Sequence, residues 1–163
     1  MFLRTLNETL LKVAKFIIVA LMGVMTVLVF AGVLARYVFQ VQFAWGQELA
    51  RFAMIWVSFL GAAVASHRGV HSEVTFILER VSPRMRNLLN VVNFLIISTV
   101  LFCLGWYGAV QAWANRLQFS PTLRVSMSYP YAAIPVGSLL MFLFTIEAVI
   151  TKIKPDKKRT RRE

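Results

Sequence analysis

The sequence predicts an all-α membrane protein with four transmembrane helices. Three observations indicate this fold class: the composition, the spacing of the charges and the distribution of Lys and Arg. Of the 163 residues, 58% are hydrophobic and 15% are charged, against roughly 45 to 50% and about 25% in soluble domains. Three runs without Asp, Glu, Lys or Arg cover residues 16–35, 87–115 and 125–146. Each is long enough to cross a hydrocarbon core about 30 Å thick as a helix. The composition therefore disfavours a soluble enzyme, a disordered chain and a compact nucleic-acid-binding domain.

The predicted spans form a single membrane domain over residues 1–150. They cover about residues 16–35, 43–66, 88–114 and 131–150. The second span must begin near Phe43 and carry Glu48 and Arg51 in its first turns, because the uncharged run after Arg51 is only 16 residues long. The first span is expected to be retained, since its uncharged run of 20 residues exceeds the roughly 7 to 15 of a signal-peptide core.

The distribution of basic residues predicts the orientation. Of the 18 Lys and Arg residues, 14 lie in the amino-terminal segment, in the connection between spans two and three, or in the tail. Such residues collect on the cytoplasmic side of a membrane, so both termini are expected to be cytoplasmic. The basic tail at residues 151–163 is expected to face anionic lipid headgroups rather than nucleic acid.

A short amphipathic helix is predicted between spans two and three, over residues 70–81. Its apolar positions at helical spacing are Val70, Val74, Ile77, Leu78 and Val81. Ser72 can cap its start, and Pro83 lies just beyond its end. A helix of this kind lies in the plane of the membrane interface. It either fills the space between two helix ends or grips a partner, and the residues leave both roles open.

The segment from Phe2 to Val13 has a second apolar stripe. Its members are Leu3, Leu6, Leu10 and Val13. The segment either continues the first span into the cytoplasm or bends along the membrane surface, and the sequence does not decide between the two.

Residues that could carry redox or metal chemistry are sparse. Cys103 is the only cysteine, and it lies inside the third span, so a dithiol relay or a Cys-based zinc site is excluded. The only histidines, His67 and His71, share one predicted cytoplasmic turn, whereas a metal or haem site needs further ligands or a facing pair. We therefore expect no cofactor, no metal and no enzymatic activity.

Glu48 and Arg51 are charged residues in the first turns of the second span. They lie three positions apart and share a helix face with Trp45. Either both are solvated in the headgroup layer, where Arg can extend toward water, or they make an interhelical or intersubunit contact, because ionisable groups at membrane depth are usually paired. The sequence leaves both interpretations open.

The predicted spans carry no ionisable residue near the membrane midplane, where ion-coupled transporters bind their ions and substrates. This chain is therefore not expected to transport a substrate by itself. Small residues indicate close helix packing. They are Ser58, Gly61, Ala62, Ala65 and Ser66 in span two, and Gly105 and Gly108 in span three. Pro135 is expected to kink span four near its outer end.

Several stretches, in a consistent order, resemble the small membrane subunit of tripartite ATP-independent periplasmic (TRAP) transporters. They are Arg36–Phe39, Trp45–Arg51, Trp56, Phe59–Ala63, His71–Thr75, Ser82-Pro83, Ser120-Pro121 and Tyr131–Gly137. The resemblance covers nearly the whole chain. The chain departs from the family at Gln47, where a first acid often follows the tryptophan, and at Thr75, where Asp is frequent.

The resemblance implies a role in a three-part uptake system. A soluble periplasmic protein would capture an organic acid, a large membrane subunit would move it with sodium, and this subunit would brace the large one and help to dock the binding protein. The chain would then be a multi-pass protein of a bacterial inner membrane, in contact with lipid and with both partners. Intersubunit or docking contacts would come from Arg36, Trp45, Glu48 and Arg51. The interfacial helix would join the scaffold through His71, Val74, Ile77, Leu78 and Val81.

Two alternatives from other functional classes remain. One is a membrane-anchor subunit of a respiratory enzyme complex, which a haem absorbance band would favour. The other is a stand-alone small transporter, which uptake by proteoliposomes containing only this chain would favour.

Overall fold

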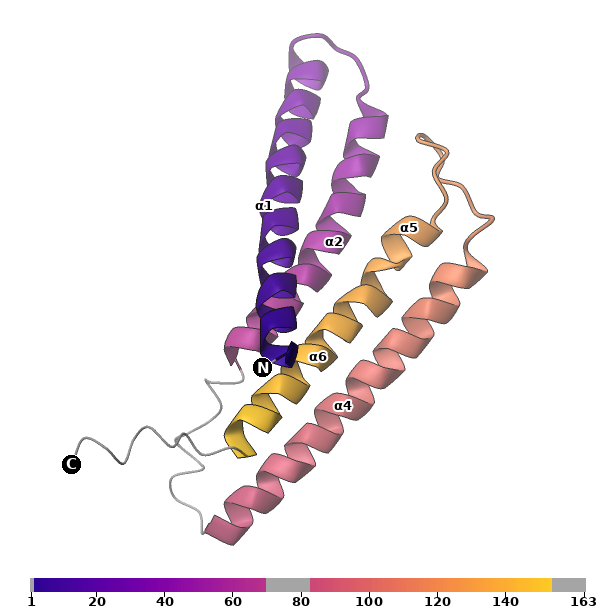
Figure 1. Ribbon diagram of the computed structural model, residues 1–163. Coiled ribbons are helices and arrows are strands. Elements are labelled where there is room, and N and C mark those ends of the chain that lie inside the picture. The colour runs from indigo at the N-terminus through magenta and orange to yellow at the C-terminus, as the bar shows by residue number, and fades with distance from the viewer. Residues whose placement is uncertain (1, 70–82, 154–163) are drawn as a thin grey trace, which may run out of the picture.

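The structure, a computed structural model, describes residues 2–69 and 83–153, and these residues form helices and their connections (Figure 1). The helices are α1 (Phe2–Tyr37), α2 (Ala44–Gly69), α4 (Pro83–Ala114), α5 (Ser128–Tyr131) and α6 (Ala133–Ile153). The predicted interfacial helix over residues 70–81, with His71, Val74, Ile77, Leu78 and Val81, lies outside the described residues. So does the tail from residue 154 onward.

Four helical segments in the described residues are long and apolar enough to cross a membrane. They are Thr5–Tyr37, Ala44–His67, Val91–Ala114 and Ser128–Glu147. The predicted fold class, all-α with four membrane-spanning helices, is confirmed to this extent. The cytoplasmic location of both termini and the single-domain organisation of residues 1–150 stay predictions.

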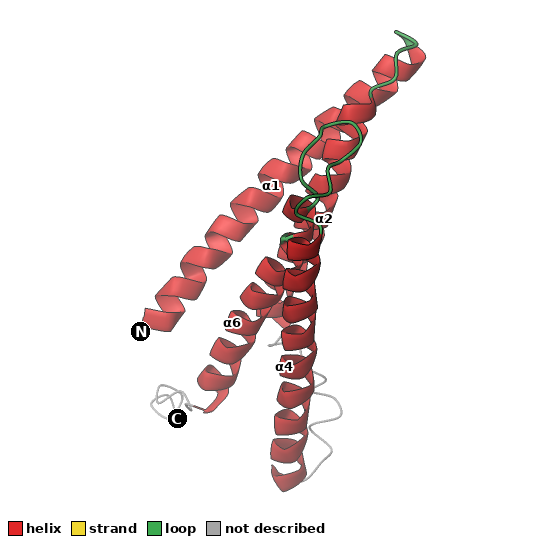
Figure 2. Ribbon diagram, turned by 90° about the vertical axis from the view of Figure 1, so that its right-hand side faces the viewer, coloured by secondary structure: helices red, strands yellow, loops and turns green. Residues whose placement is uncertain are grey.

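The four long helices stand side by side in a row, in the order α1, α2, α6 and α4. Figure 1 shows α6 between α2 and α4, and Figure 2 shows it between α1 and α4 from the side. We call the end with the connections 38–43 and 115–127 the loop end, and the end with residues 2 and 153 the termini end. Among residues 2–69 and 83–153, α1 packs mainly against α2, and α4 packs against α6 and the short α5, so the membrane-spanning parts of α1 and α4 have few buried residues.

The amino-terminal segment continues the first span, since α1 runs without interruption from Phe2 to Tyr37. Near the termini end α1 reaches α6 through Asn7, which is 2% exposed. The Asn7 side-chain amide donates to Glu147 Oε2 at 2.6 Å and to the backbone carbonyl of Leu143 at 3.3 Å. Buried amides are costly unless paired, so this contact holds the start of α1 against the end of α6.

Replacing Asn7 with leucine should loosen this contact, because Glu147 and the Leu143 carbonyl then lose a buried donor. We expect a loss of roughly 1 to 3 kcal/mol in unfolding free energy and faster hydrogen exchange at residues 5–15. Thr9→Ala is the matched control, since the Thr9 hydroxyl is exposed and donates only to the Thr5 carbonyl of its own helix, at 2.9 Å. Equal exchange in the two variants would contradict the prediction.

Glycines allow α6 to approach both of its neighbours closely. A Cβ added at Gly137 would lie 2.7 Å from the Phe59 Cβ of α2, and one at Gly108 would lie 2.6 Å from the Ile134 Cγ2 of α6. A Cβ at Gly105 would lie 3.1 Å from the Ser138 hydroxyl. The packing role predicted for Gly105 and Gly108 is therefore confirmed.

The small residues predicted to pack on span two behave differently. Ser58, Ala62 and Ala65 are exposed, and no atom lies within 4 Å of a Cβ added at Gly61. The small residues of α2 that are buried are Gly46, Ala50, Ala53 and Ala63. α2 therefore carries small residues on two faces. Within the described residues, one of these faces packs against other helices and the other does not.

The fourth span begins as two pieces. Pro135 has no N–H with which to bond the carbonyl of Tyr131, four residues earlier, and the helix is interrupted between α5 and α6 at Ala132. Ala132 keeps helical dihedral angles, φ −62° and ψ −20°, and its carbonyl accepts a hydrogen bond from Val136 N at 3.2 Å. The chain is therefore nearly continuous between α5 and α6, and the kink expected from Pro135 stays a prediction.

Candidate interaction site at the loop end

The connection between α4 and α5, residues 115–127, is a small ordered turn rather than an open loop. Ser120 N donates to Val125 O at 2.9 Å, and Met127 N donates to Gln118 O at 2.8 Å. The turn between these bonds contains Arg124 at φ 50°, a left-handed conformation that non-glycine residues seldom adopt. The chain therefore reverses tightly over residues 120–125 and turns backbone N–H groups toward α2.

Glu48 of α2 accepts hydrogen bonds from this turn. The backbone N–H groups of Thr122 and Leu123 donate to its Oε2 at 3.2 and 3.0 Å. Glu48 is 8% exposed. Two successive N–H groups that converge on one carboxylate oxygen form a compact anion-binding concavity. Glu48 therefore fastens the 115–127 turn to the beginning of α2.

The contact made by Glu48 decides between the two sequence interpretations for this residue. A solvated pair with Arg51 is wrong for Glu48, because its carboxylate is buried and bonds to the 115–127 turn. The interaction joins α2 to the turn between α4 and α5 and lies within the chain. An additional intersubunit contact by Glu48 stays a prediction.

Arg51 and Trp45 lie near Glu48 in sequence but are exposed. Arg51 has no ion-pair partner within residues 2–69 and 83–153. The Trp45 ring packs edge-on against Phe43, with ring centroids 4.4 Å apart. Both side chains are therefore available to another molecule at the loop end.

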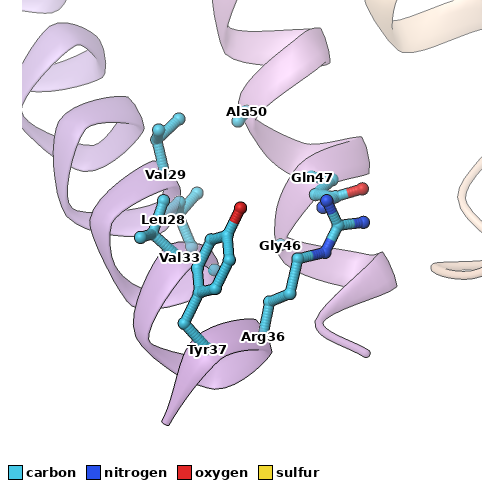
Figure 3. Close-up of a pocket in the computed structure, with 9 residues that line it drawn as sticks. Leu28, Val29, Val33, Arg36, Tyr37, Gly46, Gln47 and Ala50 are labelled. Atoms are coloured by element: carbon cyan, nitrogen blue, oxygen red, sulfur yellow. The ribbon is translucent and has the colours of Figure 1, made fainter. Parts of the chain in front are cut away.

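Arg36 is the fourth predicted contact residue, and it lies at the end of α1. A hollow of about 230 Å³ separates α1 from the beginning of α2. Figure 3 shows the Arg36 side chain extending toward Gln47 of α2, with the Tyr37 ring between the two helices. The structure thus brings Arg36 together with Gln47, whereas Glu48 turns away to the 115–127 turn.

Two features of the loop end were not predicted from the sequence: the partners of Glu48 and the position of Gln47 near Arg36. The partners of Glu48 are backbone groups of Thr122 and Leu123, 74 and 75 residues away, and backbone donors carry no residue-type signal. Gln47 was noted only as a departure from the family pattern. The Ser120-Pro121 pair was the available signal for the turn, and Ser120 is buried at its start.

Of the two histidines, only His67 lies within the described residues, and possible metal ligands can be assessed only there. The His67 ring packs edge-on against Phe144 of α6, with centroids 5.2 Å apart, while His71 lies outside the described residues. Within residues 2–69 and 83–153, no three His, Cys, Asp or Glu side chains are grouped so that they could hold a metal ion.

Several known proteins resemble this chain. A putative TRAP transporter small permease protein of Haemophilus influenzae is 23% identical over 93% of this chain and 94% of its own length. The C4-dicarboxylate TRAP transporter small permease protein DctQ of Vibrio cholerae is 29% identical over 82% of this chain and 68% of its own length. The sialic acid TRAP transporter permease protein SiaT of Haemophilus influenzae is 25% identical over 78% of this chain, but the match covers only 21% of that longer protein.

One protein family matches most of this chain. The family described as tripartite ATP-independent periplasmic transporters, DctQ component, matches residues 25–154. This range includes the last 13 residues of α1 and all of α2, α4, α5 and α6. Together with the four membrane-spanning helices, the match shows that the chain is a multi-pass membrane protein and belongs to the DctQ family, the small permease subunits of TRAP transporters.

Proposed function

We propose that this subunit braces a large TRAP membrane subunit and helps to dock a periplasmic binding protein during sodium-coupled uptake of an organic acid. Membership of the family implies association with a large membrane subunit. The observation that carries the bracing role is the row of helices. The most hydrophobic 18-residue window of α1 contains no buried residue, and that of α4 is only 6% buried. A row with such uncovered faces offers a long apolar wall for a second membrane protein.

The lack of charged residues in two of the spans also supports a bracing role. The runs at residues 16–35 and 87–115 hold no Asp, Glu, Lys or Arg, and the Glu48 carboxylate accepts hydrogen bonds from the 115–127 turn. Substrate and sodium sites would then lie in the large subunit. The relatives are named for C4-dicarboxylate and for sialic acid. Both substrates are carboxylates, which supports an organic acid as the substrate class here.

The docking role rests on the loop end. The concentration of Lys and Arg in the terminal segments and in the connection between spans two and three supports a loop end that faces the periplasm. Arg36, Trp45 and Arg51 are exposed there. An arginine and an aromatic ring are residues that commonly dominate protein interfaces.

Deleting this chain should abolish uptake by cells that keep the large subunit and the binding protein, and the chain should co-purify with the large subunit. Robust uptake by proteoliposomes that contain only this chain would overturn the proposal. Unchanged uptake after deletion would overturn it as well.

Arg51→Ala should lower uptake more than Arg159→Ala does, because Arg51 is exposed at the loop end and has no ion-pair partner among the described residues. The measurement is uptake of labelled substrate by cells with equal amounts of each variant. Arg159→Ala removes the same charge from the tail and serves as the control. Equal and negligible effects would remove Arg51 from the docking surface.

A further inference from the structure

The groove between α1 and α2 at the loop end is polar at one end and apolar at the other. The apolar end is lined by Leu28, Val29 and Val33 of α1, and the polar end by Arg36 and Gln47. A second hollow of about 120 Å³ shares Gly32, Arg36 and Gln47 with the first. The two hollows therefore form one groove, which we call the α1–α2 groove, and Arg36 stands where they meet.

The groove exists because the facing positions are small. Gly32 on α1 and Ala50 on α2 both line the hollow and provide no long side chains to fill it, whereas the space beside Gly46 is taken by the Phe43 ring. A Cβ at Gly32 would make only ordinary contact with the Phe43 ring, at 3.6 Å. From Leu28 to Arg36 the helix rises about 12 Å. The groove is thus long in the direction of the bilayer normal and opens to the side.

Arg36 gives the groove its charge. Its guanidinium has no ion-pair partner among residues 2–69 and 83–153, and Figure 3 shows it beside Gln47 at the mouth of the hollow. A guanidinium binds the oxygens of a phosphate in a bidentate manner. Gln47 adds amide donors at the same place.

We propose that the α1–α2 groove binds one phospholipid of the adjacent leaflet, with its phosphate on Arg36 and Gln47 and one acyl chain along Leu28, Val29 and Val33. This arrangement matches the ligand: a phosphate lies at headgroup depth and an acyl chain extends from it toward the membrane midplane. A carboxylate side chain of a partner would satisfy Arg36 but would leave the apolar length of the groove without an occupant. The inference depends on the membrane location of the chain and not on the docking role.

The test is native mass spectrometry of the full chain in detergent, with dioleoyl phosphatidylglycerol titrated as the probe. Wild type should retain one lipid. Arg36→Leu should weaken its binding about tenfold, as expected for the loss of a charge-assisted hydrogen bond. Arg116→Leu is the matched control, because Arg116 is exposed in the connection after α4, lies over Trp113 and lines neither hollow.

A second pair of variants fills the groove without touching the charge. Val33 and Val27 are 48% and 67% exposed on α1, and only Val33 lines the groove. Val33→Trp should displace the lipid, whereas Val27→Trp should not. Dioleoylglycerol, which lacks the phosphate, and inorganic phosphate, which lacks the acyl chains, should each bind at least about tenfold more weakly than the phospholipid.

Equal retention of phospholipid by wild type, Arg36→Leu and Val33→Trp would overturn the proposal. It would also be overturned if dioleoylglycerol or inorganic phosphate bound as tightly as the phospholipid. Loss of large-subunit binding in Arg36→Leu with unchanged lipid retention would assign the groove to a partner carboxylate instead.

Discussion

Gly137→Ala should destabilise the helix row, because the added methyl group would lie 2.7 Å from the Phe59 Cβ and 3.2 Å from the Phe59 carbonyl oxygen. A backbone carbonyl cannot rotate away as a flexible side chain can, so α6 and α2 must separate. Overpacking of this kind costs roughly 1 to 3 kcal/mol. The thermal unfolding midpoint of the purified chain in detergent should fall by about 2 to 4 °C for each kcal/mol.

The control is Gly61→Ala on α2. No atom lies within 4 Å of a Cβ at that position, so this variant gains only the higher helix propensity of alanine, up to about 1 kcal/mol. The two substitutions are chemically identical and should move the midpoint in opposite directions. Gly137→Leu should lower it further than Gly137→Ala. An equal midpoint for Gly137→Ala and Gly61→Ala would show that α2 and α6 do not meet at Phe59.

Glu48→Ala should release the 115–127 turn from α2. The Thr122 and Leu123 N–H groups would lose the oxygen that both now share, and donors left without an acceptor favour local opening of a turn. Hydrogen exchange at these two amides should accelerate at least about tenfold. Glu48→Gln keeps an acceptor oxygen without the charge and should give an intermediate rate.

Arg51→Ala separates this effect from a general loss of charge at the loop end. Its side chain is exposed and has no ion-pair partner in the part of the chain that the structure describes, so exchange at Thr122 and Leu123 should stay at the wild-type rate. If Glu48→Ala and wild type exchanged equally, the carboxylate would not hold the turn.

The four spans were predictable from the sequence because the membrane imposes a length and excludes charge. Their order in the row was not, because a small residue can face a helix of the same chain, a partner or lipid. Gly105 and Gly108 pack against α6, while Gly61 faces open space. The same pattern therefore has two outcomes, and only the positions of the other helices distinguish them.

The loop-end residues show a similar division. Arg36, Trp45, Glu48 and Arg51 were singled out for their type and depth. The partner of Glu48 depends on a turn whose donors are backbone groups, and the α1–α2 groove depends on the small residues Gly32 and Ala50. Residue types alone predict neither a space between small residues nor a hydrogen bond from a backbone donor. Asn7 was overlooked for a related reason, since its partners lie on α6, at the other end of the chain.

The single-file order of the helices affects how the subunit sits among lipids. Four axes separated by three gaps of 8 to 10 Å give a row roughly 24 to 30 Å broad between its outer axes, whereas a square bundle would be about a third as broad. Under the proposed bracing role, a large subunit attached along this row would gain breadth in the plane of the membrane. Tilting the assembly would then require the displacement of lipid along that whole breadth.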